Sequence, residues 1–251
     1  MWHAVVSIFR DYGYRRLRNK ARMKYLLEDW GPERFRTVLE EEYLGYALPD
    51  GPAPVPPTRP GDHVGVHEQK DGRFYIGAAP VVGRSSGTTL TALADLLEAH
   101  GSTRLRTTPH QKIVVLDVER DRVDAVVAGL KELGLDPEPS VFRRSTIACT
   151  GLEFCKLAIV DTKDTATAAI AQLEERLADL ADRLPERLSL HVNGCPNSCA
   201  RIQTADIGLK GQLLPDDDGG QTPGFQVHLG GGLASVDRAE AGLGRSVRGL
   251  K

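Results

Sequence analysis

Four cysteines, in two tight pairs, are the residues whose types and spacing could do chemistry. Cys149 and Cys155 are separated by five residues, and Cys195 and Cys199 by three. A disulfide framework is typical of small secreted chains, whereas zinc knuckles usually place two to four residues between paired ligands. A 4Fe–4S cluster takes four thiolates from loops rich in Gly, Pro and backbone N–H groups. The pairs are flanked by Thr150-Gly151 and Asn193-Gly194, with Pro196-Asn197 between the last two cysteines, which favours a cluster.

The third part of the chain holds all four cysteines. A helix over residues 165–184 separates the first pair from a predicted strand over 188–192, which the second pair follows. Two further strands are predicted over 205–209 and 225–229, with a polar loop over 215–222. His191 and His228 lie in strand-like runs, which predicts core or edge positions rather than ligand positions.

The segment before the cysteines has the pattern of a small split βαβ unit. Strands are predicted over 64–66, 74–78 and 113–118, and helices over 89–100 and 122–133, the second helix ending at Gly134. The pattern predicts an α+β fold in which a ferredoxin-like half-domain over 62–136 precedes a domain over 137–251 that carries the cysteines.

The N-terminal region is predicted to be helical over residues 1–50, with a break at Gly31-Pro32. Residues 51–61 are rich in proline and are expected to form a stiff linker. The predicted first helix is basic, since seven Lys and Arg residues between Arg10 and Lys24 are accompanied by Asp11 alone. Such a face is either solvated or a site for an anion, an acidic partner or a cofactor with many carboxylates.

The composition argues against a nucleic-acid-binding protein and against a membrane protein. The chain has 251 residues, with 32 Lys plus Arg against 34 Asp plus Glu and a formal net charge of -2, so nucleic-acid binding driven by overall charge is not expected. The apolar runs are too short for a membrane span, so neither a membrane nor a nucleic acid is an expected partner. We expect a soluble cytoplasmic protein.

The cysteine motifs resemble those of the sirohaem-dependent sulfite and nitrite reductases. The matching stretches are C-T-G-L-E-F-C-K at 149–156 and V-N-G-C-P-N-S-C-A at 192–200. Further resemblance lies at 18–22, 106–111, 205–209 and 228–232, and it is closest to ferredoxin-dependent enzymes of the actinobacterial type. The resemblance implies that 137–251 is a sirohaem and 4Fe–4S domain of the α/β-sandwich type.

The resemblance also implies site residues. Cys149, Cys155, Cys195 and Cys199 would hold the 4Fe–4S cluster, and Cys199 would be shared with the sirohaem iron. Sirohaem carries many carboxylates, so Arg18, Gln111 and Asn197 are expected cofactor contacts.

The implied reaction is the six-electron reduction of sulfite to sulfide or nitrite to ammonia, with ferredoxin as the electron donor. The residues of the substrate-anion pocket are expected in a first half that this sequence lacks, which makes a separate first-half chain a candidate partner. The end of the sequence is expected to be truncated relative to the family. The alternative function is a non-catalytic or vestigial iron–sulfur electron-transfer module that is inactive without such a partner.

Overall fold

The computed structural model describes residues 1–52, 61–184, 188–232 and 245–247, and the predicted linker over 51–61 lies mostly outside them. The chain divides into two compact units, residues 1–55 and 56–251. No helix among the described residues combines the length and the apolar character needed to cross a bilayer.

The N-terminal unit is helical, as predicted. Its elements are α1 (Trp2–Tyr12), a 3-10 turn (Arg18–Lys20), α2 (Met23–Val38) and a π-helical turn (Leu39–Leu44). Ala4, Ile8, Leu26 and Leu39 form its core. Gly31 inside α2 has φ 74° and ψ 163°, which confirms the predicted break before Pro32.

The prediction of one basic helix is wrong in this unit. α1 ends at Tyr12, and the basic residues from Arg15 to Arg22 lie in irregular chain around the 3-10 turn. The physical reasons are local. Gly13 leaves the helix with an extended backbone (φ -67°, ψ 133°), since glycine is a weak helix former, and neighbouring like charges destabilise a continuing helix.

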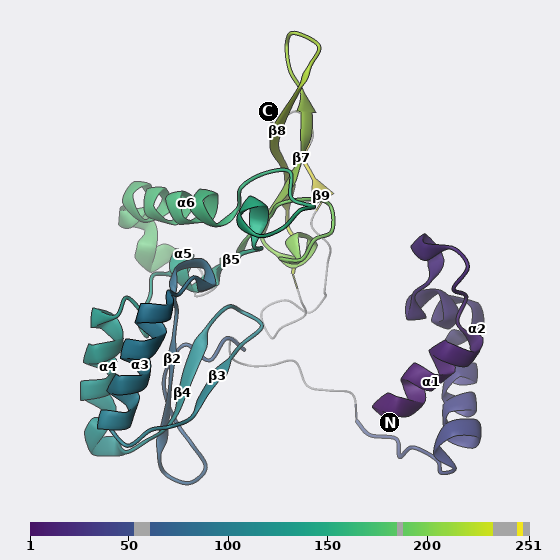
Figure 1. The fold of residues 1–251 in the computed structure, drawn as a ribbon, viewed down its shortest axis with the longest axis horizontal. Coiled ribbons are helices and arrows are strands. Elements are labelled where there is room, and N and C mark those ends of the chain that lie inside the picture. Colours follow the sequence, from purple (N-terminus) through teal and green to yellow (C-terminus); the bar gives the residue numbers. More distant parts are fainter. Residues whose placement is uncertain (53–60, 185–187, 233–244, 248–251) are drawn as a thin grey trace. The chain divides into compact units, whose positions relative to one another are not determined.

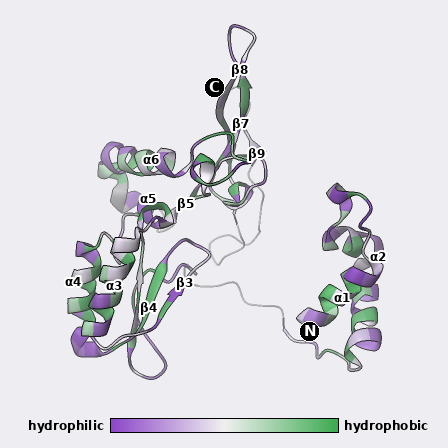
Figure 2. Ribbon diagram, in the orientation of Figure 1, coloured by the Kyte–Doolittle hydropathy of each residue, from purple (hydrophilic) through white to green (hydrophobic). Residues whose placement is uncertain are grey.

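The first sheet of the second unit is antiparallel and four-stranded, in the order β1-β2-β4-β3 (Figure 1). Its elements are β1 (Gly65–Glu68), β2 (Phe74–Ala78), a 3-10 turn (Val81–Gly83), α3 (Gly87–Ala99), β3 (Leu105–Thr107), β4 (Ile113–Val118), a 3-10 turn (Arg120–Arg122) and α4 (Val123–Glu132). Ile76, Val115, Leu93 and Leu130 belong to one core between sheet and helices. In Figure 2 the central strand β4 is hydrophobic, whereas the helices carry both polar and apolar residues.

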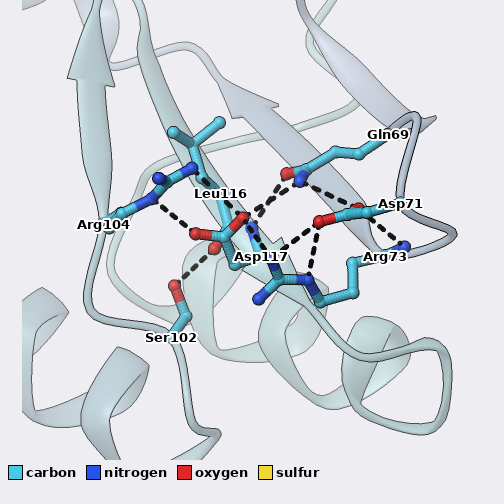
Figure 3. Close-up of polar contacts among 7 residues, drawn as sticks. All are labelled: Gln69, Asp71, Arg73, Ser102, Arg104, Leu116 and Asp117. Carbon is cyan, nitrogen blue, oxygen red and sulfur yellow. Dashed lines mark hydrogen bonds and ion pairs between the residues drawn. The ribbon is translucent and has the colours of Figure 1, made fainter.

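A network of hydrogen bonds and ion pairs surrounds Asp117 near the C-terminal end of β4 (Figure 3). Asp117, at φ 61° near the end of β4, accepts a 3.0 Å hydrogen bond from Gln69, and its backbone N–H donates to Gln69 Oε1 at 2.9 Å. Its carboxylate also pairs with Arg104 at 2.5 Å and Arg73 at 3.3 Å. The hydrogen bond from Gln69, together with these cations, lowers the pKa of Asp117.

The second sheet carries the cysteines and has the order β5-β6-β7-β8-β9. Its strands are β5 (Thr146–Ala148), β6 (Leu190–Asn193), β7 (Ile207–Pro215), β8 (Gln221–Leu229) and β9 (Arg245–Ser246). The helices and helical turns of this segment are α5 (Val141–Ser145), Gly151–Glu153, α6 (Lys163–Arg176), Ala178–Arg183 and Ile202–Thr204. β5, β6 and β7 are parallel and the remaining pairs antiparallel. The α+β class with a ferredoxin-like half-domain is thereby confirmed.

Candidate functional site: the two cysteine loops

The two cysteine pairs lie at the same edge of the second sheet. β5 and β6 pair in parallel, so their carboxyl ends meet, and Cys149 follows β5 while Cys195 follows β6 by two residues. The N–H of Cys149 donates to Val192 O at 3.0 Å, which continues the ladder. The N–H of Gly194 donates to Cys149 Sγ at 3.1 Å. The second cysteine loop therefore donates a hydrogen bond to the sulfur of Cys149 in the first loop.

The first loop is folded tightly around Thr162, which precedes α6. Thr162 Oγ1 donates to Cys149 O at 2.6 Å, and Cys155 N–H donates to Gly151 O at 3.0 Å. Gly151 has φ +65°, and a Cβ there would lie 2.4 Å from Thr162 Oγ1. Glycine is required at this position for both reasons. Ile159 N–H donates to Gly194 O at 2.7 Å and joins this loop to the second.

The second loop is closed by Asn193, whose side chain is fully buried. Its Nδ2 donates to Cys195 O at 2.5 Å, and its Oδ1 accepts from Ala200 N–H at 2.8 Å. Both polar atoms of the Asn193 side chain therefore hold the backbone of the loop. Cys195 is buried and Cys199 exposed, so one end of the loop faces inward and the other outward.

The four thiols and the loops that hold them have the chemistry of an iron–sulfur site. All four cysteines are free. Among the described residues, no three His, Cys, Asp or Glu side chains are placed to hold one metal ion. Backbone N–H groups directed at cysteine sulfur, as at Cys149, are what a cluster site provides. The donor set and its setting therefore fit a 4Fe–4S cluster.

Lys163 supplies positive charge near the first cysteine. It begins α6, and its Nζ donates to Val82 O at 2.5 Å. Burial lowers the pKa of Lys163, and the nearby Arg84 lowers it further, while the Cys149 and Glu153 charges oppose both. Val82 is itself held at φ 48°, a rare backbone conformation for a β-branched residue.

Gln111 reaches the first cysteine loop from the half-domain. Its Nε2 donates to Ala148 O at 2.7 Å, and its Oε1 accepts from Ala148 N–H at 3.2 Å. Each polar atom keeps one further hydrogen-bonding position. The expected contact between Gln111 and a cofactor therefore stays a prediction.

The other two expected cofactor contacts lie in different settings. Asn197 is exposed in the loop between Cys195 and Cys199, beside the proposed cluster ligands. Arg18 is exposed in the 3-10 turn of the N-terminal unit. Both roles stay predictions.

A buried charged network lies beneath β5, and the sequence did not reveal it. Arg144 and Asp62 form a two-point ion pair at 2.7 and 3.1 Å. Burial alone would raise the pKa of Asp62, but the Arg144 hydrogen bond and charge hold it below its usual value. These two residues, with His110, Ser145, Ile147 and His191, line a cavity of about 10 Å³. His191 is buried, as predicted, and its Nδ1 lies 3.2 Å from Arg201 O.

The site residues that sequence reasoning missed are mostly tertiary partners. Thr162 and Lys163 contact or approach the cysteines through folding, and neither carried a local signal. Gly194, directly before Cys195, was one of the flanking residues from which a cluster was inferred.

Family comparisons agree with this architecture. The family model described as "Nitrite/Sulfite reductase ferredoxin-like half domain" matches residues 67–133. The model described as "Nitrite and sulphite reductase 4Fe-4S domain" matches residues 1–47 and 142–248. The helical N-terminal unit and the cysteine segment are therefore matched by the same family model.

Similar proteins include reductases named for both substrates. Sulfite reductase (ferredoxin) 1 of Mycolicibacterium paratuberculosis is 55% identical over 248 residues, which are 99% of this chain and 44% of the relative. An assimilatory ferredoxin-dependent nitrite reductase of Haloferax mediterranei is 36% identical over 239 residues, 91% of this chain and 40% of the relative. The solved structure of the Mycobacterium tuberculosis NirA protein aligns with a TM-score of 0.92 at 54% identity, over 98% of this chain and 44% of that one.

The chain thus spans less than half the length of these relatives. The match extends over the half-domain and both cysteine loops. On these grounds, the chain belongs to the nitrite and sulfite reductase family.

Proposed function

We propose that this chain is the cluster- and sirohaem-bearing half of a six-electron reductase that converts sulfite to sulfide or nitrite to ammonia with electrons from ferredoxin. The observation that carries the proposal is the meeting of both cysteine pairs at the carboxyl ends of β5 and β6, with Gly194 N–H bonded to Cys149 Sγ. This arrangement brings the two donor loops together.

The four cysteines differ in solvent exposure, and this difference indicates which groups each can bind. Cys149, Cys155 and Cys195 are buried or half-buried and are suited to hold a cluster away from water. Cys199, the fourth proposed cluster ligand, is exposed, so its sulfur is the one that can also reach a second group on the outer side. When bound, the cluster would supply electrons one at a time, and sirohaem would supply an iron for the substrate anion.

The remaining residues hold the loop backbone, balance the charge of the cluster or contact the sirohaem. Asn193 fixes the backbone on both sides of the second loop, and Thr162 fixes that of the first. Lys163 offsets part of the negative charge that thiolates and sulfides would bring. Arg18 and Asn197 are proposed to contact sirohaem carboxylates. The choice between sulfite and nitrite is assigned to residues outside this chain.

The test uses the full chain, expressed anaerobically with or without a second chain that carries the remaining part of the M. paratuberculosis relative. We expect iron and acid-labile sulfide in the chain alone. With the partner we expect sirohaem absorption and oxidation of reduced ferredoxin that depends on sulfite or nitrite. Cys199→Ser is the variant to compare with wild type. It should still associate with the second chain, but it should lose the activity that depends on sirohaem.

Each negative outcome has a distinct meaning. A chain that takes up neither iron nor sulfide refutes the proposal as a whole. Iron and sulfide without sirohaem, even with the partner present, would favour a non-catalytic iron–sulfur module.

A further inference from the structure

The strand that leads to the first cysteine lies at the edge of its sheet. Within the described parts of the chain, β5 pairs with β6 on one side only. Successive residues of a strand direct their N–H and C=O groups to opposite sides, and Cys149 N–H faces β6, where it bonds Val192 O at 3.0 Å. The N–H and C=O of Ala148 face away from β6. Because Ala148 is fully buried, both groups need partners inside the protein.

Gln111 provides both partners. It accepts from Ala148 N–H at 3.2 Å and donates to Ala148 O at 2.7 Å. A carboxamide has the same donor and acceptor as a peptide group, so Gln111 acts as a single-residue extension of the sheet. The peptide that joins Ala148 to Cys149 is therefore held at both ends, by Gln111 at its oxygen and by Val192 at its nitrogen.

The position of Gln111 is itself set by the half-domain. It lies in a tight turn, with its N–H bonded to Thr108 O at 3.1 Å and its φ at 58°. Gly83 packs against it, since a Cβ at Gly83 would lie 2.7 Å from Gln111 Cβ. The half-domain thus leaves one defined place for this side chain.

We propose that Gln111 is a positioning residue for Cys149, through which the half-domain orients the first cluster ligand. The inference rests on the proposed function, because Cys149 matters here as a ligand. The geometry that supports it consists of hydrogen bonds within this chain.

The first test therefore needs no cluster. The reduced full chain is treated with iodoacetamide, and alkylation of each cysteine is followed by peptide mass spectrometry. In Gln111→Ala we expect Cys149 to react about tenfold faster relative to the exposed Cys199, since two hydrogen bonds of its strand end are lost. Gln111→Glu should behave the same way despite its equal size, because a carboxylate cannot donate to Ala148 O.

A glycine pair gives a matched control that leaves Gln111 intact. Gly83 and Gly72 have φ values of +69° and +84°, so alanine is strained at both. Only at Gly83 would the new methyl group displace Gln111, since nothing lies within 4 Å of a Cβ at Gly72. Gly83→Ala should accelerate Cys149 alkylation, and Gly72→Ala should not.

A second readout is the electron paramagnetic resonance spectrum after anaerobic reconstitution with ferrous iron and sulfide. We expect the Gln111 variants to show an altered spectrum of the reduced cluster and lower iron content. The inference is overturned if Cys149 reactivity and the spectrum are unchanged in both variants, or if all four cysteines accelerate equally, which indicates general unfolding. A wild-type chain that binds no cluster refutes the proposed function, while the alkylation experiment still decides the role of Gln111.

Discussion

Replacement of Lys112 by Met tests the electrostatics beneath the cysteine strands. Lys112 is 2% exposed, and its Nζ donates to His110 O at 2.8 Å. Burial lowers the pKa of Lys112 from 10.5 to about 8, the Arg143 and Arg144 charges act in the same direction, and Asp62 opposes them. Methionine has a similar length and removes the titrating group.

The magnitude follows from the two pKa values. A difference of about 2.5 units at 1.36 kcal/mol each corresponds to about 3 kcal/mol. Between pH 8 and 10.5 the unfolded chain binds more protons at this site than the folded chain does. The contribution of Lys112 to the free energy of unfolding therefore rises with pH across this window, and the Met variant lacks that rise.

The assay is urea unfolding under reducing conditions at several pH values. Trp2 and Trp30, the two tryptophans of the chain, both lie in the N-terminal unit, so their fluorescence follows that unit alone. Far-ultraviolet circular dichroism follows the second unit as well. For the second unit, we take the free energy of unfolding of wild type minus that of Lys112→Met. We expect this value to rise by about 3 kcal/mol from pH 8 to 10.5, because wild type gains stability with pH and the variant does not. The tryptophan transition should be the same in both proteins.

Lys131 is the matched control, because it is half-exposed and its hydrogen bond to Glu138 raises its pKa. Lys131→Met should not reproduce the rise. A difference between wild type and Lys112→Met that is flat across the window would refute the reasoning, since the buried ammonium would then keep its ordinary pKa.

Three further substitutions test other contacts. Asp117→Ala should lower the free energy of unfolding of the second unit by about 2 kcal/mol, and Asp117→Gly by about 1 kcal/mol less, because glycine tolerates the φ of 61°; equal losses in urea unfolding would contradict this. Asn193→Ala should abolish most cluster uptake, measured as iron and acid-labile sulfide, since Cys195 O and Ala200 N–H lose their partner; full uptake would show that the loop closes without it. Lys163→Met should lower the midpoint potential of the cluster by about 60 mV, roughly a tenfold change in the reduction equilibrium, and Lys163→Arg should not; an unchanged potential in a redox titration would rule out this role of the charge.

Prediction from the sequence was accurate where burial alone determines an element. The apolar runs over 74–78 and 113–118 are strands with those bounds, and the helices over 89–100 and 122–133 are α3 and α4 to within two residues. Strands β3 and β5 were not predicted. Each has three residues, too few for a clear pattern; β3 pairs with the next strand β4 across a short turn, and β5 pairs with the distant strand β6.

In the basic N-terminal segment, one basic helix was predicted where the structure has irregular chain. The chain leaves the helix at Gly13, and neighbouring cations repel one another in a continuing helix. The chemistry suggested by this segment, an anion or carboxylate site, stays a prediction that Arg18 variants can test.

The sequence by itself determined the kind of chemistry, because thiolate ligands must come from cysteines and their two spacings are local. Tertiary structure decided how those ligands are held. Gln111 reaches Ala148 across 37 residues, Gly194 reaches Cys149 across 45, and Lys163 reaches Val82 across 81. Contacts between residues so far apart depend on sheet order and on packing between the half-domain and the cysteine loops, and no local pattern in the chain encodes them.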